Sequence, residues 1–120
     1  MYVASTILIV DDHPGFRATA RALLVAEGFE VIGEVGDGRS ALEAARRLKP
    51  DLVLLDVQLP DTDGFAVASE LCKENGGGPI VVLTSSHDAS DFGSLVKGCG
   101  AAAFVPKAEL TGAALRAVLR

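Results

Sequence analysis

The sequence alternates five short apolar runs with longer segments of helical periodicity, and this alternation constrains the fold more than any other feature. The expected strands are residues 6–10, 29–35, 51–55, 80–83 and 102–105. The expected helices are residues 14–26, 39–49, 64–75, 88–97 and 110–119. Strands that alternate with helices along a chain form a parallel sheet with crossover helices on both faces. We therefore expect a doubly wound α/β domain.

The apolar content of the runs predicts the order of the strands. Residues 6–10, 51–55 and 80–83 are nearly continuous apolar runs, whereas residues 29–35 include charged side chains. A strand that is covered on both faces reads as a continuous apolar run, so the first, third and fourth strands should be central. Right-handed crossovers then favour the flavodoxin-like order 2-1-3-4-5. We expect one domain over residues 1–120.

Polar side chains stand at the carboxyl ends of four of the expected strands. Asp11 and Asp12 follow the first strand and Asp56 follows the third. Thr84 ends the fourth strand, and Lys107 comes shortly after the fifth. The carboxyl ends of parallel strands lie at one edge of the sheet, where such folds bind their ligands. We therefore expect these five side chains to meet there.

Three carboxylates at one edge need a source of positive charge. Two like charges about 4 Å apart repel by about 4 kcal/mol at an effective dielectric constant near 20. Either one carboxylate is protonated or a cation lies among them. Oxygen ligands on an open edge suit Mg²⁺, and Lys107 would add a second positive charge. A phosphoryl group would be drawn to the same place, where a carboxylate can attack phosphorus to form an acyl phosphate.

Composition argues against several classes of function. The net charge is −5, from 11 Lys and Arg against 16 Asp and Glu, which disfavours direct binding of nucleic acid by this domain. No apolar run approaches the roughly 20 residues that span a membrane, and no signal peptide is evident, so a cytoplasmic location is expected. Cys72 and Cys99 lack the spacing of a metal site and are predicted to be two buried thiols. His13 is expected to be a loop residue, and Asp61 and Asp63 turn residues, without catalytic roles.

Five motifs distributed over the chain point to one protein family. They are ILIVDDHP at residues 7–14, PDLVLLDVQLP at 50–60, DG at 63–64, IVVLTS at 80–85 and FVPK at 104–107. Together they resemble the receiver domain of bacterial two-component response regulators. The DHP and PK pairings resemble those of the NarL-type branch. The resemblance implies the CheY-like fold, a doubly wound five-stranded parallel sheet.

The resemblance also implies a role for the residues at the strand ends. Asp56 would accept a phosphoryl group from a phosphohistidine on a sensor histidine kinase, and Lys107 would contact that group. Asp11, Asp12, Asp56 and the backbone carbonyl of Gln58 would bind Mg²⁺, the one expected cofactor. Enzymatic activity would be limited to self-phosphorylation and self-dephosphorylation.

A conformational switch is the second implication of the resemblance. Thr84 would be the switch hydroxyl and Phe104 the switch aromatic that turns inward behind it. The turn would remodel the face of the fourth helix, fifth strand and fifth helix, a candidate homodimer surface, and so control an output domain or downstream protein with a transcriptional effect. Many receivers have glycine, tyrosine and proline where this chain has Ala103, Phe104 and Ala108. We expect the switch to survive with an altered balance between its two states.

Two alternatives differ from this interpretation. The chain could be a phosphorylation-independent docking or dimerisation module built on the receiver fold. It could also be a phosphatase with an aspartyl nucleophile, but that chemistry usually needs an Asp-x-Asp pair after the first strand and a cap domain. Here the expected nucleophile follows the third strand, which disfavours the phosphatase.

Overall fold

A five-stranded parallel sheet in the order β2-β1-β3-β4-β5 forms the centre of the molecule. The structure, a computed structural model, describes residues 5–73, 78–86, 96 and 98–119. The strands are β1 Thr6–Val10, β2 Glu30–Val35, β3 Leu52–Asp56, β4 Ile80–Ser85 and β5 Ala103–Pro106. The α-helices are α1 Pro14–Ala26, α2 Gly38–Leu48, α3 Gly64–Cys72 and α5 Gly112–Leu119. The predicted fold and strand order are confirmed, while the expected helix at 88–97 lies outside the described residues, except for Val96.

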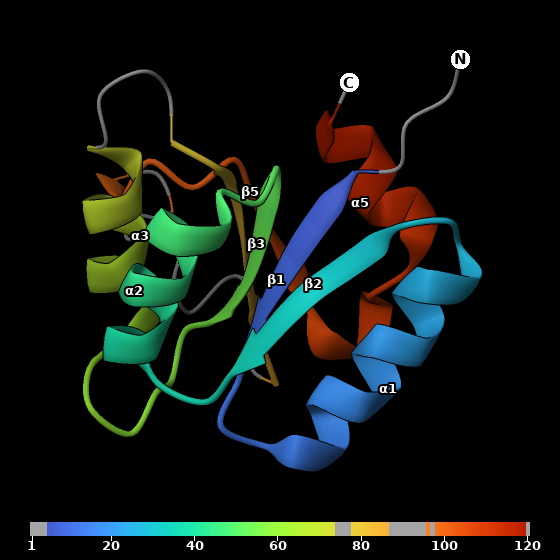
Figure 1. Cartoon of the computed structure of the whole chain (residues 1–120), viewed down its shortest axis with the longest axis horizontal. Coiled ribbons are helices and arrows are strands. Elements are labelled where there is room, and N and C mark those ends of the chain that lie inside the picture. The colour runs from blue at the N-terminus through green and yellow to red at the C-terminus, as the bar shows by residue number, and fades with distance from the viewer. Residues whose placement is uncertain (1–4, 74–77, 87–95, 97, 120) are drawn as a thin grey trace.

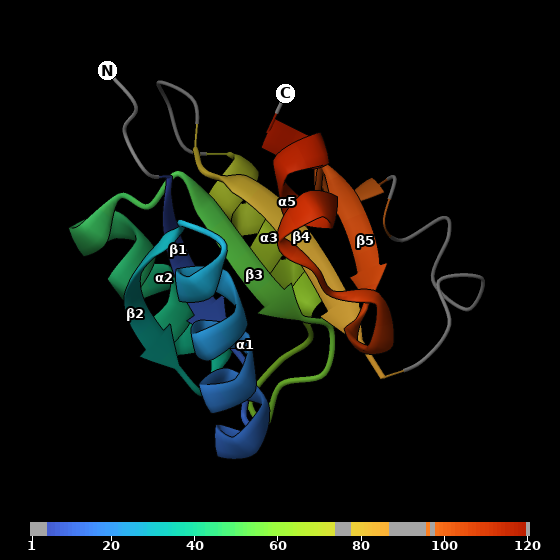
Figure 2. The same ribbon diagram turned by 90° about the vertical axis from the view of Figure 1, so that its right-hand side faces the viewer.

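The helices form two layers, one on each face of the sheet (Figures 1 and 2). Side chains of a strand alternate between the two faces, and β1 shows the consequence. Leu8 and Val10 join the apolar cluster beneath α2 and α3, while Ile7 and Ile9 join the cluster beneath α1 and α5. All four side chains are buried, which explains why β1 reads as an unbroken apolar run.

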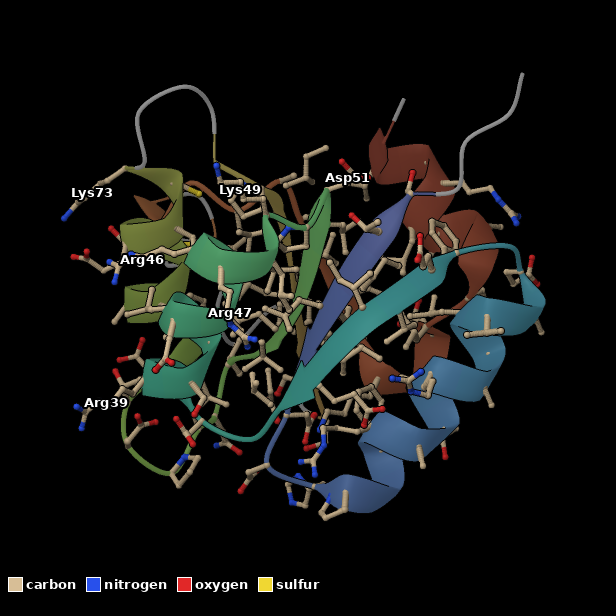
Figure 3. The ribbon with its side chains drawn as sticks, in the orientation of Figure 1. Arg39, Arg46, Arg47, Lys49, Asp51 and Lys73 are labelled. Carbon is tan, nitrogen blue, oxygen red and sulfur yellow. The ribbon has the colours of Figure 1, made fainter. Side chains whose placement is uncertain are left out.

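The α2 helix is amphipathic in the way that its sequence predicts. Its alanines pack on the sheet, and its arginines point away from it (Figure 3). At its start, the Asp37 carboxylate accepts a hydrogen bond from the Ser40 amide at 2.8 Å, an N-cap that satisfies a backbone donor without a helical partner. At its end, Lys49 takes a left-handed conformation with φ 48°.

Aspartates in the loop after β3 secure the starts of two helices. Asp61 accepts hydrogen bonds from the amides of Gly38 and Arg39, in the first turn of α2. Asp63 is the N-cap of α3 and accepts from the Ala66 amide at 2.8 Å. Both aspartates therefore serve the loop and helix geometry, as expected for turn residues.

The prediction of two buried thiols is wrong for one of the cysteines. Cys99 is buried, but Cys72, the last residue of α3 and not one of its buried residues, is exposed. Its Sγ donates to the Gly100 carbonyl oxygen at 3.3 Å. Partial burial, with the nearby Cys99 as a second cause, raises the pKa of the Cys72 thiol.

Side chains also hold the other end of the sheet, where β1 and β3 begin. The Asp51 carboxylate, before β3, accepts hydrogen bonds from the Thr6 amide at 2.9 Å and the Thr6 hydroxyl at 3.1 Å (Figure 3). These bonds tie the starts of β1 and β3 together. Within the described residues, no helix combines the length and the apolar character that crossing a membrane requires.

Gly64 is the position where the packing of α3 on β3 can be tested. A Cβ at Gly64 would overlap the Asp56 carbonyl oxygen and lie 2.8 Å from the Val57 Cα. Because both neighbours are backbone atoms, we expect Gly64→Ala to lower the free energy of unfolding by about 1–3 kcal/mol in urea denaturation. Gly15→Ala in α1 is the control, since a Cβ there meets nothing within 4 Å. Equal stability of Gly64→Ala and the wild type would contradict the close packing.

Candidate functional site

The carboxyl ends of the strands bring distant residues together at one edge of the sheet, where the arrowheads of β3, β4 and β5 lie in Figure 2. Asp11 follows β1, and Asp56 ends β3, where it pairs in register with Thr84 of β4. Lys107 follows β5 and contacts Asp56 although the two are 51 positions apart in sequence. The structure therefore places these four residues together, as the strand pattern suggested.

Lys107 bridges two buried carboxylates. Its Nζ lies 2.7 Å from Oδ2 of Asp11 and 3.1 Å from Oδ2 of Asp56. Asp11 is 1% exposed and Asp56 is 4% exposed, so neither carboxylate has water as its main partner. The other oxygen of Asp56, Oδ1, accepts a hydrogen bond from the Gln58 amide at 3.0 Å. Both oxygens of Asp56 are thus held in defined positions.

The two carboxyl groups differ in their electrostatics. Burial, aided by the negative charge of Asp11, raises the pKa of Asp56 despite its contacts with Gln58 and Lys107. Burial also acts to raise the pKa of Asp11, but hydrogen bonds from Lys107 and His13 outweigh it and the pKa is lowered. Burial alone would lower the pKa of Lys107, and its two carboxylate partners raise it instead. Asp56 is therefore the carboxylate whose charge is least stabilised.

The outer part of the site contains Asp12 and His13. Their side chains are 39% and 69% exposed, and His13 Nδ1 lies 3.1 Å from Oδ1 of both Asp11 and Asp12. One potential ligand atom from each of Asp11, Asp12, His13 and Asp56 lies within 4.8 Å of the others. Three carboxylates against the one ammonium of Lys107 leave an excess of negative charge, which suits a divalent cation with oxygen ligands. The sequence analysis gave His13 no role, although its position directly after the two aspartates indicated that it could lie beside them.

Thr84 lies near the end of β4, and Phe104 lies on the neighbouring strand β5 at the outer edge of the sheet, one pair before the residue opposite Thr84. Thr84 is 1% exposed, and its Oγ1 has no hydrogen-bond partner among the residues that the structure describes. Phe104 pairs with Leu83 of β4, is half-buried and packs against the cluster beneath α2 and α3. The described peptide bonds are all trans, including those that precede Pro106 and Ala108.

Two residues in the first turn of α1 reach the site and were missed by the sequence analysis. The Phe16 ring centroid lies 4.4 Å from the Lys107 Nζ. The Arg17 guanidinium donates to the Asp11 carbonyl oxygen at 2.6 Å. Helical spacing places Phe16 among the apolar residues of α1, but its contact with a lysine ninety-one positions further on cannot be read from local periodicity.

The raised pKa of Asp56 makes a prediction about stability. A native pKa above that of the unfolded chain means that the ionised carboxylate destabilises the native state at pH 7. We expect Asp56→Asn to raise the free energy of unfolding by about 1 kcal/mol in metal-free buffer at pH 7. The gain should shrink as the pH falls and Asp56 becomes protonated. Asp12→Asn, at a more exposed carboxylate, should have a smaller effect, and an Asp56→Asn chain less stable than the wild type would contradict this electrostatic picture.

Comparison with known proteins places this chain in a family. The model of the response regulator receiver domain matches residues 7–120. The transcriptional regulatory protein PdtaR of Mycobacterium tuberculosis is 36% identical over 125 residues, covering 97% of this chain and 60% of PdtaR. The DNA-binding transcriptional activator EvgA of Escherichia coli is 35% identical over 102 residues, covering 85% of this chain and 50% of EvgA. The chain therefore spans only 50 to 60% of the length of these two regulators.

A solved structure gives the same result for the fold. The signal receiver domain of NarL from Mycobacterium tuberculosis matches with a TM-score of 0.84 at 32% identity, and the alignment covers 98% of both chains. The family model covers nearly the whole sequence, and the structural match includes every described element. The chain belongs to the receiver domain family of two-component response regulators.

Proposed function

We propose that Asp56 accepts a phosphoryl group from the phosphohistidine of a sensor histidine kinase, and that the phosphorylated chain switches a protein-interaction surface. The observation that carries this proposal is the buried Asp56 carboxylate, held by the Lys107 ammonium on one oxygen and the Gln58 amide on the other. It lies at the carboxyl end of β3, where doubly wound folds bind their ligands.

The proposed step is a transfer between two nucleophiles. A carboxylate oxygen of Asp56 forms a bond to phosphorus while the P–N bond of phosphohistidine breaks. The electron pair of the broken P–N bond stays on the departing imidazole nitrogen. The Lys107 ammonium, now between Asp11 and Asp56, is close enough to follow the phosphoryl oxygens and offset their charge. This self-phosphorylation, and the later hydrolysis of the acyl phosphate by water, are the only covalent reactions proposed.

The donor set of the site fits Mg²⁺. Asp11, Asp12 and Asp56 supply carboxylate oxygens within 4.8 Å of one another, and we propose the Gln58 backbone carbonyl as a further ligand. When bound, Mg²⁺ supplies positive charge for the phosphoryl oxygens and for the carboxylates that Lys107 alone cannot neutralise. Asp11 would offer the ion a carboxylate oxygen from a buried position, where its lowered pKa keeps it ionised. Asp12 would offer one from the open side of the site.

Thr84 and Phe104 are the proposed switch residues. The buried Thr84 hydroxyl has a proton to donate and no acceptor among the described residues, so an adjacent phosphoryl oxygen would give it a charge-assisted hydrogen bond that only the phosphorylated state provides. A contact available in one state biases an equilibrium between two conformations. Movement of Thr84 on β4 would be coupled to the half-buried Phe104 ring on the neighbouring strand β5 and would remodel the face of β5 and α5, a candidate homodimer surface.

The proposed output is transcriptional and acts through another domain or protein. The relatives are named as transcriptional regulators and are longer than this chain, and the net charge of −5 does not favour nucleic acid binding by the receiver itself. We therefore propose that residues 1–120 act as one receiver domain whose partners are a sensor kinase and an output domain or downstream protein.

Intact-mass measurement tests the acceptor residue. With Mg²⁺ and phosphoramidate, a small donor with a P–N bond, we expect a mass increase of one phosphoryl group in the wild type. The increase should be absent from Asp56→Asn and should require Mg²⁺. Asp51→Asn, at the opposite end of the sheet, should be phosphorylated like the wild type. A chain that takes no phosphoryl group, or takes one equally well as Asp56→Asn, would instead support a phosphorylation-independent docking module.

The switch role of Thr84 makes a separate prediction. Thr84→Val removes the hydroxyl with little change in volume, so the chain should still be phosphorylated at Asp56. Amide chemical shifts of β5 and α5 should change on phosphorylation of the wild type and should change far less in Thr84→Val. Thr111→Val, at the start of α5, is the control, because the Thr111 hydroxyl only accepts a bond from the Ala114 amide. A full response in Thr84→Val would remove Thr84 from the switch.

A further inference from the structure

Phe16 offers the face of its ring to the Lys107 ammonium. The Nζ lies 4.4 Å from the ring centroid, inside the roughly 6 Å within which a cation is attracted by the negative face of an aromatic ring. Lys107 is only 16% exposed, so little water competes for its ammonium. The attraction should therefore be stronger than for a solvated lysine on a protein surface.

Phosphorylation would change Asp56 chemically, and Asp11 is a proposed Mg²⁺ ligand, whereas the Phe16 ring takes part in neither event. The other two close neighbours of Lys107 are the carboxylates of Asp11 and Asp56. On phosphorylation, Asp56 becomes part of an acyl phosphate, and the ammonium must turn from its carboxylate to the phosphoryl oxygens. A lysine side chain is long and flexible, so a contact that persists through this change keeps the ammonium within reach of the reacting atoms.

Arg17 fixes the position of the Phe16 ring relative to the site. Arg17 is the next residue in the first turn of α1, and its guanidinium donates to the Asp11 carbonyl oxygen at 2.6 Å. It also forms an ion pair with Glu34 of β2 at 3.5 Å, and Glu34 pairs with Arg21, one turn further along α1. The start of α1 is thereby tied to the same strand end that presents Asp11, so the ring and the carboxylate move together.

We propose that Phe16 is a positioning residue that holds the Lys107 ammonium beside Asp56 through the face of its ring, and so sets the rate at which Asp56 is phosphorylated. The inference rests on the proposed function, because it concerns the same reaction. The alternative role for Phe16 is packing alone, since the ring also packs against the apolar cluster beneath α1 and α5. Packing depends on the volume of the ring, whereas the attraction for the ammonium depends on its electron density.

Fluorination separates these two roles. Phenylalanines with one, two and three fluorine atoms at position 16 lower the electron density of the ring face stepwise with little change in volume. With phosphoramidate and saturating Mg²⁺, we expect the phosphorylation rate to fall stepwise along this series, by about three- to tenfold in total. Phe16→Leu should show a similar loss, and the urea midpoints of the fluorinated chains should stay near that of the wild type.

The same series at Phe29 is the matched control. The Phe29 ring centroid lies 5.5 Å from the Arg116 Cζ, so it also faces a cation, but it precedes β2 at the end of the sheet away from Asp56. Fluorination at Phe29 should leave the phosphorylation rate unchanged. If both series slow the reaction equally, the effect of Phe16 is a general one on the fold and the positioning role is wrong.

Nuclear magnetic resonance tests the contact without any phosphorylation. The ring current of Phe16 should shift the ε-methylene protons of Lys107 upfield in the unphosphorylated chain, and Phe16→Leu should abolish the shift. A Lys107 signal that Phe16→Leu leaves unchanged overturns the inference, whether or not Asp56 is an acceptor. A flat rate across the Phe16 series with normal phosphorylation also overturns it, while the proposed function stands. A wild type that takes no phosphoryl group overturns the proposed function and, with it, the control of rate by Phe16.

Discussion

The balance between two buried carboxylates and one ammonium governs the arrangement of this site. Asp11 and Asp56 are almost without exposure to solvent, and Lys107 lies between them at 2.7 and 3.1 Å. Like charges in such surroundings repel strongly unless a cation separates them. One ammonium stabilises Asp11 well, as the lowered pKa of Asp11 shows, and leaves Asp56 with a raised pKa. The site is therefore short of positive charge and suited to a divalent cation.

The buried strands of the sheet make this arrangement possible, because they end directly beneath the charged side chains of the site. The strands β1, β3 and β4 are buried along their lengths and end at one edge, so Asp11, Asp56 and Thr84 are presented by backbone that packs on both faces. Lys107 comes from the mostly exposed 3₁₀ turn after β5 and reaches inward to the carboxylates. A long, flexible lysine side chain over carboxylates that the strands hold in place suits phosphoryl transfer, since the ammonium can follow the phosphoryl oxygens while the carboxylates stay where they are.

Much of this could be predicted from the sequence, because periodicity and burial are local in origin. The strand order followed from which apolar runs were continuous, and the meeting of Asp11, Asp56, Thr84 and Lys107 followed from the geometry of parallel strands. The bounds of β1 and α1 match the expected ones, and those of the other described elements differ by at most three residues; α5, for example, begins at Gly112 rather than at residue 110. Contacts of helix side chains with distant residues could not be predicted, because helical spacing shows which face of the helix a residue occupies and not what it meets there. This is why the contact of Phe16 with Lys107 was missed and why the predicted burial of Cys72 was wrong.

A double-mutant cycle on Lys107 and Asp11 measures the central interaction most directly. The free energies of unfolding of the wild type, Lys107→Met, Asp11→Asn and the double variant would be compared in metal-free buffer at pH 7. We expect a favourable coupling of about 1–3 kcal/mol, because Lys107→Met leaves the buried Asp11 carboxylate without the ammonium 2.7 Å away, and Asp11→Asn removes one of the two carboxylates that the ammonium contacts. A coupling near zero would contradict this expectation, because the ammonium and the carboxylate would then be independent groups that merely lie close together.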